Sequence, residues 1–260
     1  MQELLRAAGV FGCRDERFSV LEVGCGCAEP ARFLRREFPA TFDQYIGVTL
    51  NGCQADNASK RLAADDKVVQ VEGRARRNHV YCADAANPSS WPESLRSTLD
   101  QLSLQQKSAT GTHSLWLLAL DTLYHFAPDR KRILMYACQD MDASLMATDI
   151  ITPANLSWLD RMKLRVVFFG LQVPWKNIMT RNQYILMLIE CGYQEDCITM
   201  IDITEHCFNG FDKFTREHMQ RWEAMGGSKV IIRAVRMMGW LMGWWARTGT
   251  VREYIIIAKK

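Results

Sequence analysis

Two glycines follow a short apolar stretch near the start of the chain, in the sequence FSVLEVGCG that ends at Gly26. Glycines at such a position let the backbone approach a ligand at the amino-terminal end of a helix, because no Cβ atom stands in the way. A dinucleotide-binding motif would need a further glycine three residues on, where this chain has Glu29. A carboxylate there disfavours a pyrophosphate. The Glu29 carboxylate is compatible with a cationic ligand. The alternative is that Glu29 has only the structural role of an acidic residue in the first turn of a helix.

A histidine preceded by a tyrosine, Tyr124-His125, follows the most apolar segment of the chain, LWLLALD. A neutral imidazole at this point can take a proton from an oxygen or nitrogen nucleophile, so His125 is a candidate catalytic base. The alternative is a structural histidine whose ring bonds a backbone carbonyl. Tyr124 either orients a carboxylate of the substrate or cofactor, or packs beneath a lid. Both residues are therefore candidate catalytic residues.

Two cysteines, Cys25 and Cys27, flank Gly26. Neither a C-x-x-C pair nor a nearby histidine completes a tetrahedral ligand set, so we predict no metal site. The chain has nine cysteines without a repeating spacing, which indicates reduced thiols in a cytoplasmic protein rather than a disulfide framework. Several charges within the first twenty residues argue against a signal peptide.

The elements that must position these residues alternate between apolar strands and amphipathic helices. Hydrophobic residues make up 48% of the 260, which is enough for a full core and excludes disorder. The predicted strands cover 18–26, 44–50, 79–84, 115–121, 144–151, 197–203 and 252–260, and the predicted helices 28–38, 51–65, 91–114, 133–141 and 180–193. Strand and helix in alternation predict an α/β fold with a mostly parallel sheet.

Two regions interrupt this alternation, and both are rich in tryptophan, methionine and phenylalanine. The first, 153–176, reads as an inserted helix, and the second, 205–251, as helices over 215–225 and 229–245. Core packing would explain apolar stripes at helical spacing. The surplus of large adaptable side chains nevertheless favours an apolar substrate pocket under a lid. The apolar run 237–246 is too short to span a bilayer, but transient contact with a membrane surface is a further prediction.

The charges limit the class of partner. Basic residues number 32 and acidic residues 29, which gives a formal net charge of +3. This excess is too small and too evenly mixed to favour nucleic-acid binding. The arginine cluster of Arg74, Arg76 and Arg77 is typical of a solvated loop. We therefore expect a small apolar partner and no nucleic acid.

Longer motifs in the chain resemble a known family. VLEVGCGCAEPARFL is similar to the first motif of class I S-adenosylmethionine-dependent methyltransferases. YIGVTLNGCQADNA is similar to the GxTLSxxQ segment of the branch that contains cyclopropane-fatty-acid synthases, sterol C-methyltransferases and glycine or sarcosine N-methyltransferases. CADAAN, LALDTLYHF, SLMATDI and EYIIIAKK resemble later strands of the same family, so the resemblance spans nearly the whole chain.

The resemblance implies S-adenosylmethionine as the cofactor and a set of residues that bind it. In that branch Thr49 and Gln54 would lie beside the ribose and adenosine, Asp84 would meet the adenine amino group, and Tyr124 and His125 would face the substrate. The implied cofactor-binding residues are Glu22, Gly24, Cys25, Gly26, Thr49, Leu50, Gln54, Asp84, Ala85, Leu120 and Asp121.

Two departures from the family's pattern matter. The second strand ends without the acid that usually holds both ribose hydroxyls, so ribose binding would depend on Thr49 and Gln54. Cyclopropane synthases hold a bicarbonate partly with a Glu-His pair, and Tyr124 in place of that glutamate argues against the same chemistry.

The implied fold is a Rossmann-like, seven-stranded, mostly parallel sheet with an antiparallel last strand and a helical cap made from the insertions. The predicted division is 1–152 for the cofactor-binding half, 153–179 for a cap helix, 180–204 for a core helix and strand, 205–251 for a helical cap, and 252–260 for the final strand. The predicted function is O-, N- or C-methylation of a terpenoid, sterol-like or polyketide metabolite. The alternatives are a non-methylating reaction such as cyclisation on the same fold, a binding module, and a dinucleotide-dependent dehydrogenase.

Overall fold

The computed structural model describes residues 1–12, 16–68, 77–108 and 113–260. Two of the three clustered arginines, Arg74 and Arg76, lie outside the described residues. The strands are β1 (Arg17–Val23), β2 (Phe42–Thr49), β3 (Arg77–Cys82), β4 (His113–Leu120), β5 (Ser144–Ile151), β6 (Ile198–Asp202) and β7 (Arg252–Ala258). The helices are α1 (Gln2–Ala8), α2 (Glu29–Glu37), α3 (Gly52–Val68), α4 (Glu93–Ser108), α5 (Lys131–Met135), α6 (Trp158–Gly170), α7 (Arg181–Cys191), α8 (Gly210–Ala224) and α9 (Lys229–Thr248).

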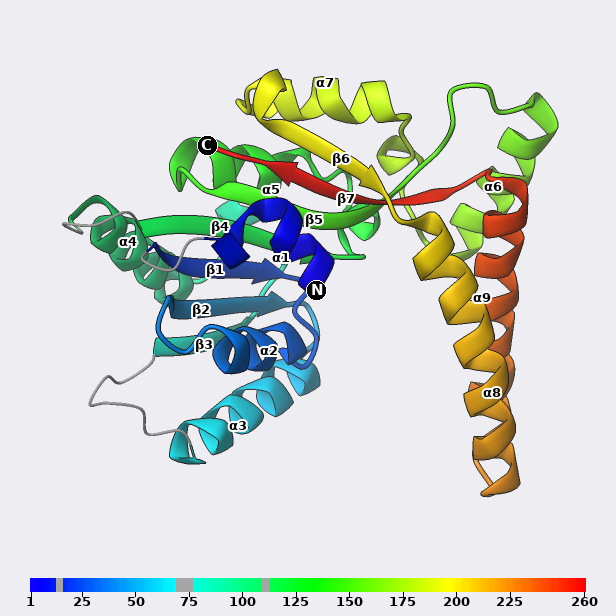
Figure 1. Ribbon diagram of the computed structural model, residues 1–260, viewed down its shortest axis with the longest axis horizontal. Helices are drawn as coiled ribbons and strands as arrows, with labels where there is room; N and C mark the ends of the chain where they lie inside the picture. The colour runs from blue at the N-terminus through cyan, green and yellow to red at the C-terminus, as the bar shows by residue number, and fades with distance from the viewer. Residues whose placement is uncertain (13–15, 69–76, 109–112) are drawn as a thin grey trace.

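The strands form one seven-stranded sheet in the order β3-β2-β1-β4-β5-β7-β6 (Figure 1). The strands β1 to β5 pair in parallel, whereas β7 runs antiparallel to both β5 and β6. All seven predicted strands are present, and the predictions of a mostly parallel sheet and an antiparallel last strand are confirmed.

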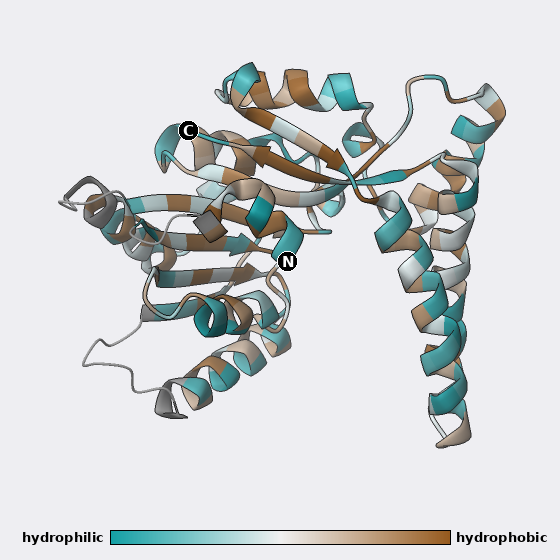
Figure 2. Ribbon diagram, in the orientation of Figure 1, coloured by the Kyte–Doolittle hydropathy of each residue, from teal (hydrophilic) through white to brown (hydrophobic). Residues whose placement is uncertain are grey.

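The sheet is covered on both faces, because successive residues of a buried strand point to opposite sides. In β1, Phe18 and Val20 pack with α1, α2 and α3, while Leu21 and Val23 pack with α4, α5 and α7. The strands are largely apolar, and the helices over them carry polar residues outward (Figure 2). This two-sided burial explains why the central strands are continuous apolar runs.

Three predicted helices differ from the observed ones. Within the segment predicted as helix over 91–114, the described residues that are helical form α4, and 109–112 lie outside the described residues. His113 and Ser114 begin β4 because they pair with Arg17 and Phe18 of β1. The helix predicted over 133–141 is α5 followed by a π-helical turn, Tyr136–Asp140. The helix predicted over 215–225 begins earlier, as α8, after a π-helical turn over Glu205–Asn209 whose Phe208 is buried.

The helices α8 and α9 form an antiparallel pair that projects from the body, on the side toward which the arrowheads of β1 and β2 point (Figure 1). A third apolar cluster holds the base of this pair, with Phe168 of α6 5.7 Å from the ring of Trp245 on α9. The inserted regions therefore have an apolar core of their own, beside the edge of the sheet where the parallel strands end.

Candidate functional site

The order of the strands creates a crevice at one point of the sheet. From β1 the chain moves outward to β2 and β3, and it then returns to the other side of β1 to add β4 and β5. The loops after β1 and β4 therefore leave in opposite directions, and open α/β sheets bind ligands at such a switch point. The site is expected beyond the carboxyl ends of these two strands.

Gly24 and Gly26 form the loop after β1. Both have positive φ angles, 70° and 52°, which favour glycine. A Cβ atom on Gly24 would stand 2.3 Å from Oγ1 of Thr122, so this glycine lets the loop after β4 approach. A Cβ on Gly26 would meet nothing within 4 Å. Protein packing therefore does not require the small residue at Gly26, which lines a cavity.

That cavity has a volume of about 440 Å³, which is in the range of small-molecule sites. Its lining residues are Gly24, Gly26, Thr49, Leu50, Asn51, Gln54, Asp84, Ala85, Ala86, Thr122, His125, Phe126 and Ala127. Most of the predicted cofactor-binding residues are in this lining, and the candidate base His125 is there as well.

The end of β2 contributes a polar pair. The hydroxyl of Thr49 donates to Oε1 of Gln54 at 3.0 Å. Gln54 is held on the first turn of α3, because its backbone N–H donates to Oδ1 of Asn51 at 3.2 Å and so caps the helix. Thr49 and Gln54 are thus adjacent on the cavity wall, with hydroxyl and amide groups that can bind a polar ligand.

The end of β3 contributes a carboxylate. Oδ1 of Asp84 accepts from the backbone N–H of Ala86 at 2.9 Å, and the carbonyl of Asp84 accepts from the indole of buried Trp91 at 2.7 Å. These two bonds fix the loop in a tight turn, so that the exposed Asp84 side chain lines the cavity from a defined position.

Two predicted cofactor residues, Glu22 and Cys25, are buried and do not line this cavity. The hydroxyl of Tyr45 donates to Oε2 of Glu22 at 2.5 Å. Burial raises the pKa of Glu22 to about 8, against the opposing effect of this hydrogen bond, and burial raises the pKa of Cys25 to about 12. These groups support the glycine loop from below, and both are uncharged at neutral pH.

The residues at the end of β4 that the family resemblance assigned to the methionine end and the substrate lie next to the cavity. Leu120, Asp121 and Tyr124 are not in its lining. The hydroxyl of Tyr124 donates to Asp121. The Asp121 side chain is accessible to solvent, yet desolvation by the surrounding protein raises its pKa to about 6. Its backbone φ of 52° turns the chain sharply at this point.

A second carboxyl group stands close to Asp121. Glu253 of β7 is buried, and desolvation, with repulsion from Asp121 and Asp149, raises its pKa well above the usual value. Asp149 is itself paired with Arg130 in the core. The region beside Tyr124 therefore has acidic character.

His125 lines the cavity from a short 3-10 turn, Leu123–His125. Desolvation lowers the pKa of His125 below its ordinary value, so the imidazole is neutral at pH 7. Its ring lies 4.4 Å from that of Tyr124, centroid to centroid. The protonation state is the one that a base requires.

A buried network holds this turn. The amide of Asn177 donates to the carbonyl oxygens of Tyr124 at 3.0 Å and Phe126 at 2.7 Å. The fully buried Arg130 in turn bonds both the backbone carbonyl of Asn177 and Asp149, and its guanidinium lies over the ring of Tyr184. The position of the turn is thus set by residues far apart in the sequence.

Several residues of the site were not predicted. Asn51, Ala86, Thr122, Phe126 and Ala127 line the cavity, and Tyr45 and Asn177 support it. Asn51 carried a signal, since asparagine before a helical pattern is typical of an N-cap. Nothing in the sequence near Asn177 indicates its bonds, because its partners are about fifty residues away.

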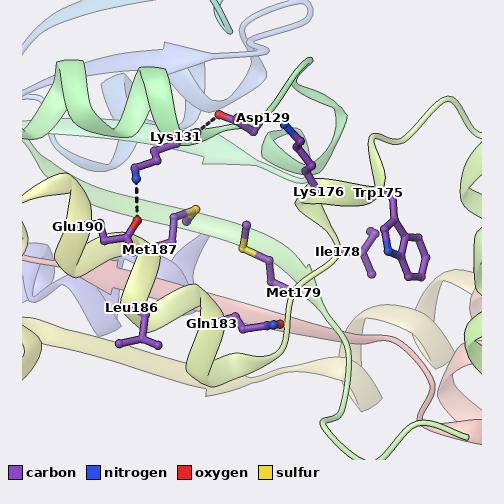
Figure 3. Close-up of a pocket in the computed structure, with 10 residues that line it drawn as sticks. All are labelled: Asp129, Lys131, Trp175, Lys176, Ile178, Met179, Gln183, Leu186, Met187 and Glu190. Carbon is purple, nitrogen blue, oxygen red and sulfur yellow. Dashed lines mark hydrogen bonds and ion pairs between the residues drawn. The ribbon is translucent and has the colours of Figure 1, made fainter.

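A second hollow, of about 470 Å³, lies along α7 and away from the glycine loop (Figure 3). Two of its charged groups, Lys131 and Glu190, form an ion pair at 2.6 Å. Met179, Leu186 and Met187 are among the apolar side chains that line it in the close-up. None of the predicted site residues lines it, so we regard the cavity at the strand ends as the candidate site.

The insertions do not reach the lining of the candidate cavity in the part of the chain that the structure describes. Their apolar cluster does extend to Tyr124, which packs against it together with Trp175, Met238 and Met242. The lid stays a prediction, and so do the proposed domain boundaries. The apolar material of the insertions adjoins the site at Tyr124.

Within the described ranges, no group of three or more His, Cys, Asp or Glu side chains is arranged to hold a metal ion. Among the same residues, no helix combines the length and apolar character needed to cross a bilayer. The eight described cysteines are all free thiols.

No protein-family model matches the chain, and no curated protein is similar enough to match. Solved structures do match it. A protein from Galdieria sulphuraria described as a sarcosine dimethylglycine methyltransferase superimposes with a TM-score of 0.72 at 12% identity, covering 100% of this chain and 84% of its own.

Two further structures show the range of activities on this fold. Phosphoethanolamine N-methyltransferase 2 from Haemonchus contortus, in complex with S-adenosyl-L-methionine, gives a TM-score of 0.67 at 15% identity. It covers 100% of this chain, which spans only 52% of the enzyme. The [4+2]-cyclase SpnF gives a TM-score of 0.61 at 15% identity, covering 98% of this chain and 80% of its own. The chain therefore has the fold of the S-adenosylmethionine-dependent methyltransferases, as its motifs predicted.

Proposed function

We propose that the protein binds S-adenosylmethionine in the cavity at the strand ends and transfers its methyl group to a small apolar metabolite. The observation that carries the proposal is the open side of Gly26. Gly26 has a positive φ and lines the cavity, and apart from its chain neighbours no protein atom lies within 4 Å of the position that a Cβ would take. Such a cradle fits the close approach of a cofactor to the backbone.

The other walls of the cavity fit the same cofactor. The Thr49 and Gln54 side chains, 3.0 Å apart, offer a hydroxyl and an amide to the ribose hydroxyls. The Asp84 carboxylate can accept a hydrogen bond from the adenine amino group. The methionine end would then point toward the loop after β4, where Asp121 and Tyr124 lie. These assignments agree with the positions that the family resemblance implies.

When bound, S-adenosylmethionine supplies a methyl group that is already activated by its sulfonium, so positioning and the exclusion of water provide much of the rate. The residues of this chain would hold the acceptor beside Tyr124 and His125. The neutral imidazole of His125 can take a proton from an oxygen or nitrogen nucleophile. An acceptor that loses no proton on methylation would need no base, and the residues of the site would only have to position it.

An apolar acceptor is supported by the cluster that adjoins Tyr124. Its partly buried members Trp175, Met238, Met242 and Trp244 are large and adaptable side chains, of the kind that line irregular apolar pockets. We propose a terpenoid, sterol-like or polyketide acceptor, and a role in secondary metabolism in the cytoplasm. The Asp121 carboxyl, which is accessible to solvent and has a pKa of about 6, would favour a position for any positive charge on the acceptor near Tyr124.

Calorimetric titration with S-adenosylmethionine tests the cofactor. We expect binding that weakens by about tenfold or more in Asp84→Ala, because the contact to the adenine would be lost. Asp196→Ala, at an exposed carboxylate away from the cavity, is the matched control and should bind as the wild type does. Tight binding of NAD without binding of S-adenosylmethionine would instead support a dehydrogenase.

Transfer of label tests the reaction. The protein is incubated with methyl-labelled S-adenosylmethionine and an extract of apolar metabolites, and the extract is examined for labelled product. A [4+2]-cyclase has this fold, so a reaction without methyl transfer is the second candidate. Cofactor binding with no labelled product from any extract would favour that candidate, or a binding module, over the methyltransferase.

A further inference from the structure

The helix α6 turns an apolar face to solvent. Trp158 is 72% exposed, Val166 71% and Phe169 87%. With Leu159 and Met162, which are also exposed, these residues form what we call the α6 face. At 100° per residue, all five fall within about one third of the helix circumference. An exposed and contiguous set of large apolar side chains indicates an interaction site.

The opposite side of α6 is firmly anchored. Leu164 and Phe168 are buried in the third apolar cluster. The first turn is capped by Ser157, whose hydroxyl accepts from the backbone N–H of Asp160 at 3.1 Å. The buried side of α6 therefore holds the helix against the protein, and the α6 face is left exposed to solvent.

Basic residues border the α6 face. Arg161 and Lys163 are exposed, and Arg165 lies 5.0 Å from the ring of Trp175. The one acidic residue of this helix, Asp160, is engaged by Ser157 at 2.7 Å and by Lys163 at 3.4 Å. An apolar face with cationic borders is typical of a helix that lies in the interface of a membrane containing anionic lipids.

The neighbouring helix α9 has the same character. Its sequence contains Lys229, Arg233, Arg236 and Arg247 but no acidic residue, and of these Arg236 is paired with Glu223 of α8 at 2.7 Å. Its exposed apolar side chains include Val230 (78%), Met237 (62%) and Trp240 (62%). α6 lies at the base of the arm that α9 forms (Figure 1), and the contact of Phe168 with Trp245 joins the two helices.

From these observations we propose that the α6 face binds the surface of a bilayer that contains anionic lipids, with α9 adding further cationic contact. Charge decides between this occupant and a second copy of the chain. Two copies paired through the α6 face would bring Arg161 and Lys163 near their own equivalents, and Asp160, the one acid of α6, is already paired with Lys163 of its own chain. Lipid phosphates and carboxylates supply the missing negative charge.

Membrane contact at this helix would also place the site near a source of apolar molecules. The buried side of α6 belongs to the cluster that reaches Tyr124. Apolar metabolites partition into bilayers, so docking would bring the acceptor side of the site to them. The docking itself does not depend on the identity of the acceptor or on methyl transfer, and it can be measured without turnover.

The test is cosedimentation of the full chain with vesicles of phosphatidylcholine that contain about one quarter phosphatidylserine. We expect the wild type to bind, with weaker binding at high salt and to vesicles of phosphatidylcholine alone. The double variant Trp158→Ser/Phe169→Ser should lose about tenfold or more in partition coefficient, because the apolar contact is removed. Arg161→Gln/Lys163→Gln should bind the anionic vesicles with a similar loss.

Leu104→Ser, at a leucine of α4 that is 63% exposed, is the matched control and should bind as the wild type does. The substituted side chains are exposed, so circular dichroism should confirm that all variants are folded. Equal vesicle binding by Trp158→Ser/Phe169→Ser and the wild type would overturn the proposal. A second outcome would also overturn it. In sedimentation equilibrium the wild type would be a dimer and Trp158→Ser/Phe169→Ser a monomer, and neither protein would bind vesicles.

Discussion

The side-chain amide of Asn177 donates a hydrogen bond to the carbonyl oxygen of Tyr124, at 3.0 Å. Asn177 follows α6, whereas Tyr124 follows β4, and the bond ties the first inserted region to the turn that presents His125 to the cavity. The same amide also bonds the carbonyl of Phe126, at 2.7 Å. The turn is thus held from outside its own segment.

Asn177→Ala should therefore lower both stability and activity. Two carbonyl oxygens and the backbone N–H of Arg130 would lose a buried partner, which costs about 2–3 kcal/mol in the free energy of unfolding. Urea unfolding measures this loss. Asn155→Ala, at an exposed asparagine in the same region, is the control and should change the stability by less than about 0.5 kcal/mol. Equal stabilities of the two variants would contradict the bonding described for Asn177.

Gly26→Ala should weaken the binding of S-adenosylmethionine by about tenfold or more, because a methyl group on this lining residue would keep the cofactor from the backbone. The cost in stability should be only about 1–2 kcal/mol, from the positive φ angle. Gly226 offers a matched control, since its φ of 80° is also positive and a Cβ there also meets nothing within 4 Å. Gly226→Ala should show the same loss of stability and normal affinity in calorimetry. Affinity reduced in both variants would indicate a general effect of backbone strain.

The pKa of the His125 imidazole should lie below 6.5, because desolvation disfavours its charged form. NMR titration of the ring protons measures this value. If His125 is the base, methyl transfer should fall as the pH drops through that pKa, and His125→Gln should reduce turnover by about 100-fold or more. His218→Gln, on the exposed surface of α8, should have no effect. Normal turnover by His125→Gln at neutral pH would leave His125 with a structural role.

Tyr124→Phe should raise the pKa of Asp121 above its value of about 6. The hydroxyl of Tyr124 donates to the ionised carboxylate and so lowers that pKa, and without this bond desolvation and repulsion from Asp149 act unopposed. A larger fraction of Asp121 would then be protonated at pH 7. Carboxyl carbon NMR measures the titration. Tyr81→Phe, where the hydroxyl bonds Thr98, should leave Asp121 unchanged. A pKa that stays at about 6 in Tyr124→Phe would exclude the bond.

Glu22→Gln should alter the pH dependence of stability. Burial raises the pKa of Glu22 from 4.5 to about 8, so the folded protein retains a proton that the unfolded chain releases. The wild type then loses stability as the pH rises between these two values, at about 1.4 kcal/mol per pH unit. Glutamine cannot titrate. Between pH 5.5 and 7.5 the free energy of unfolding of Glu22→Gln should therefore rise relative to that of the wild type, by about 1.4 kcal/mol per pH unit.

Urea unfolding at several pH values measures the effect at Glu22. The exposed Glu217→Gln serves as the control and should keep the pH dependence of the wild type. A constant difference between Glu22→Gln and the wild type over this range would show that Glu22 is ionised in the folded protein.

The amino-acid sequence by itself determined the strands, their parallel arrangement and most of the cavity. Its strands are apolar runs that a two-sided sheet must bury, and the glycines, Thr49 and Asp84 lie at or just beyond the carboxyl ends of three of them. Residues that follow parallel strands meet at one edge of a sheet, so local patterns were sufficient to bring them together. Strand boundaries shifted by at most three residues, and His113 joined β4 because it pairs with Arg17.

Only the tertiary structure decided which of these residues face the cavity and what holds them. Glu22 lies in the same motif as Gly24 and Gly26, yet its side chain is directed to Tyr45 beneath the loop, because alternate residues of a strand face opposite sides of the sheet. The bonds of Asn177 join segments about fifty residues apart, which no local pattern encodes. The sequence showed that α6 has an apolar stripe, but it did not show whether this stripe faces the protein or the solvent. A stripe shows that side chains share a face, and only packing against the rest of the chain determines whether that face is buried or, as here, open to solvent.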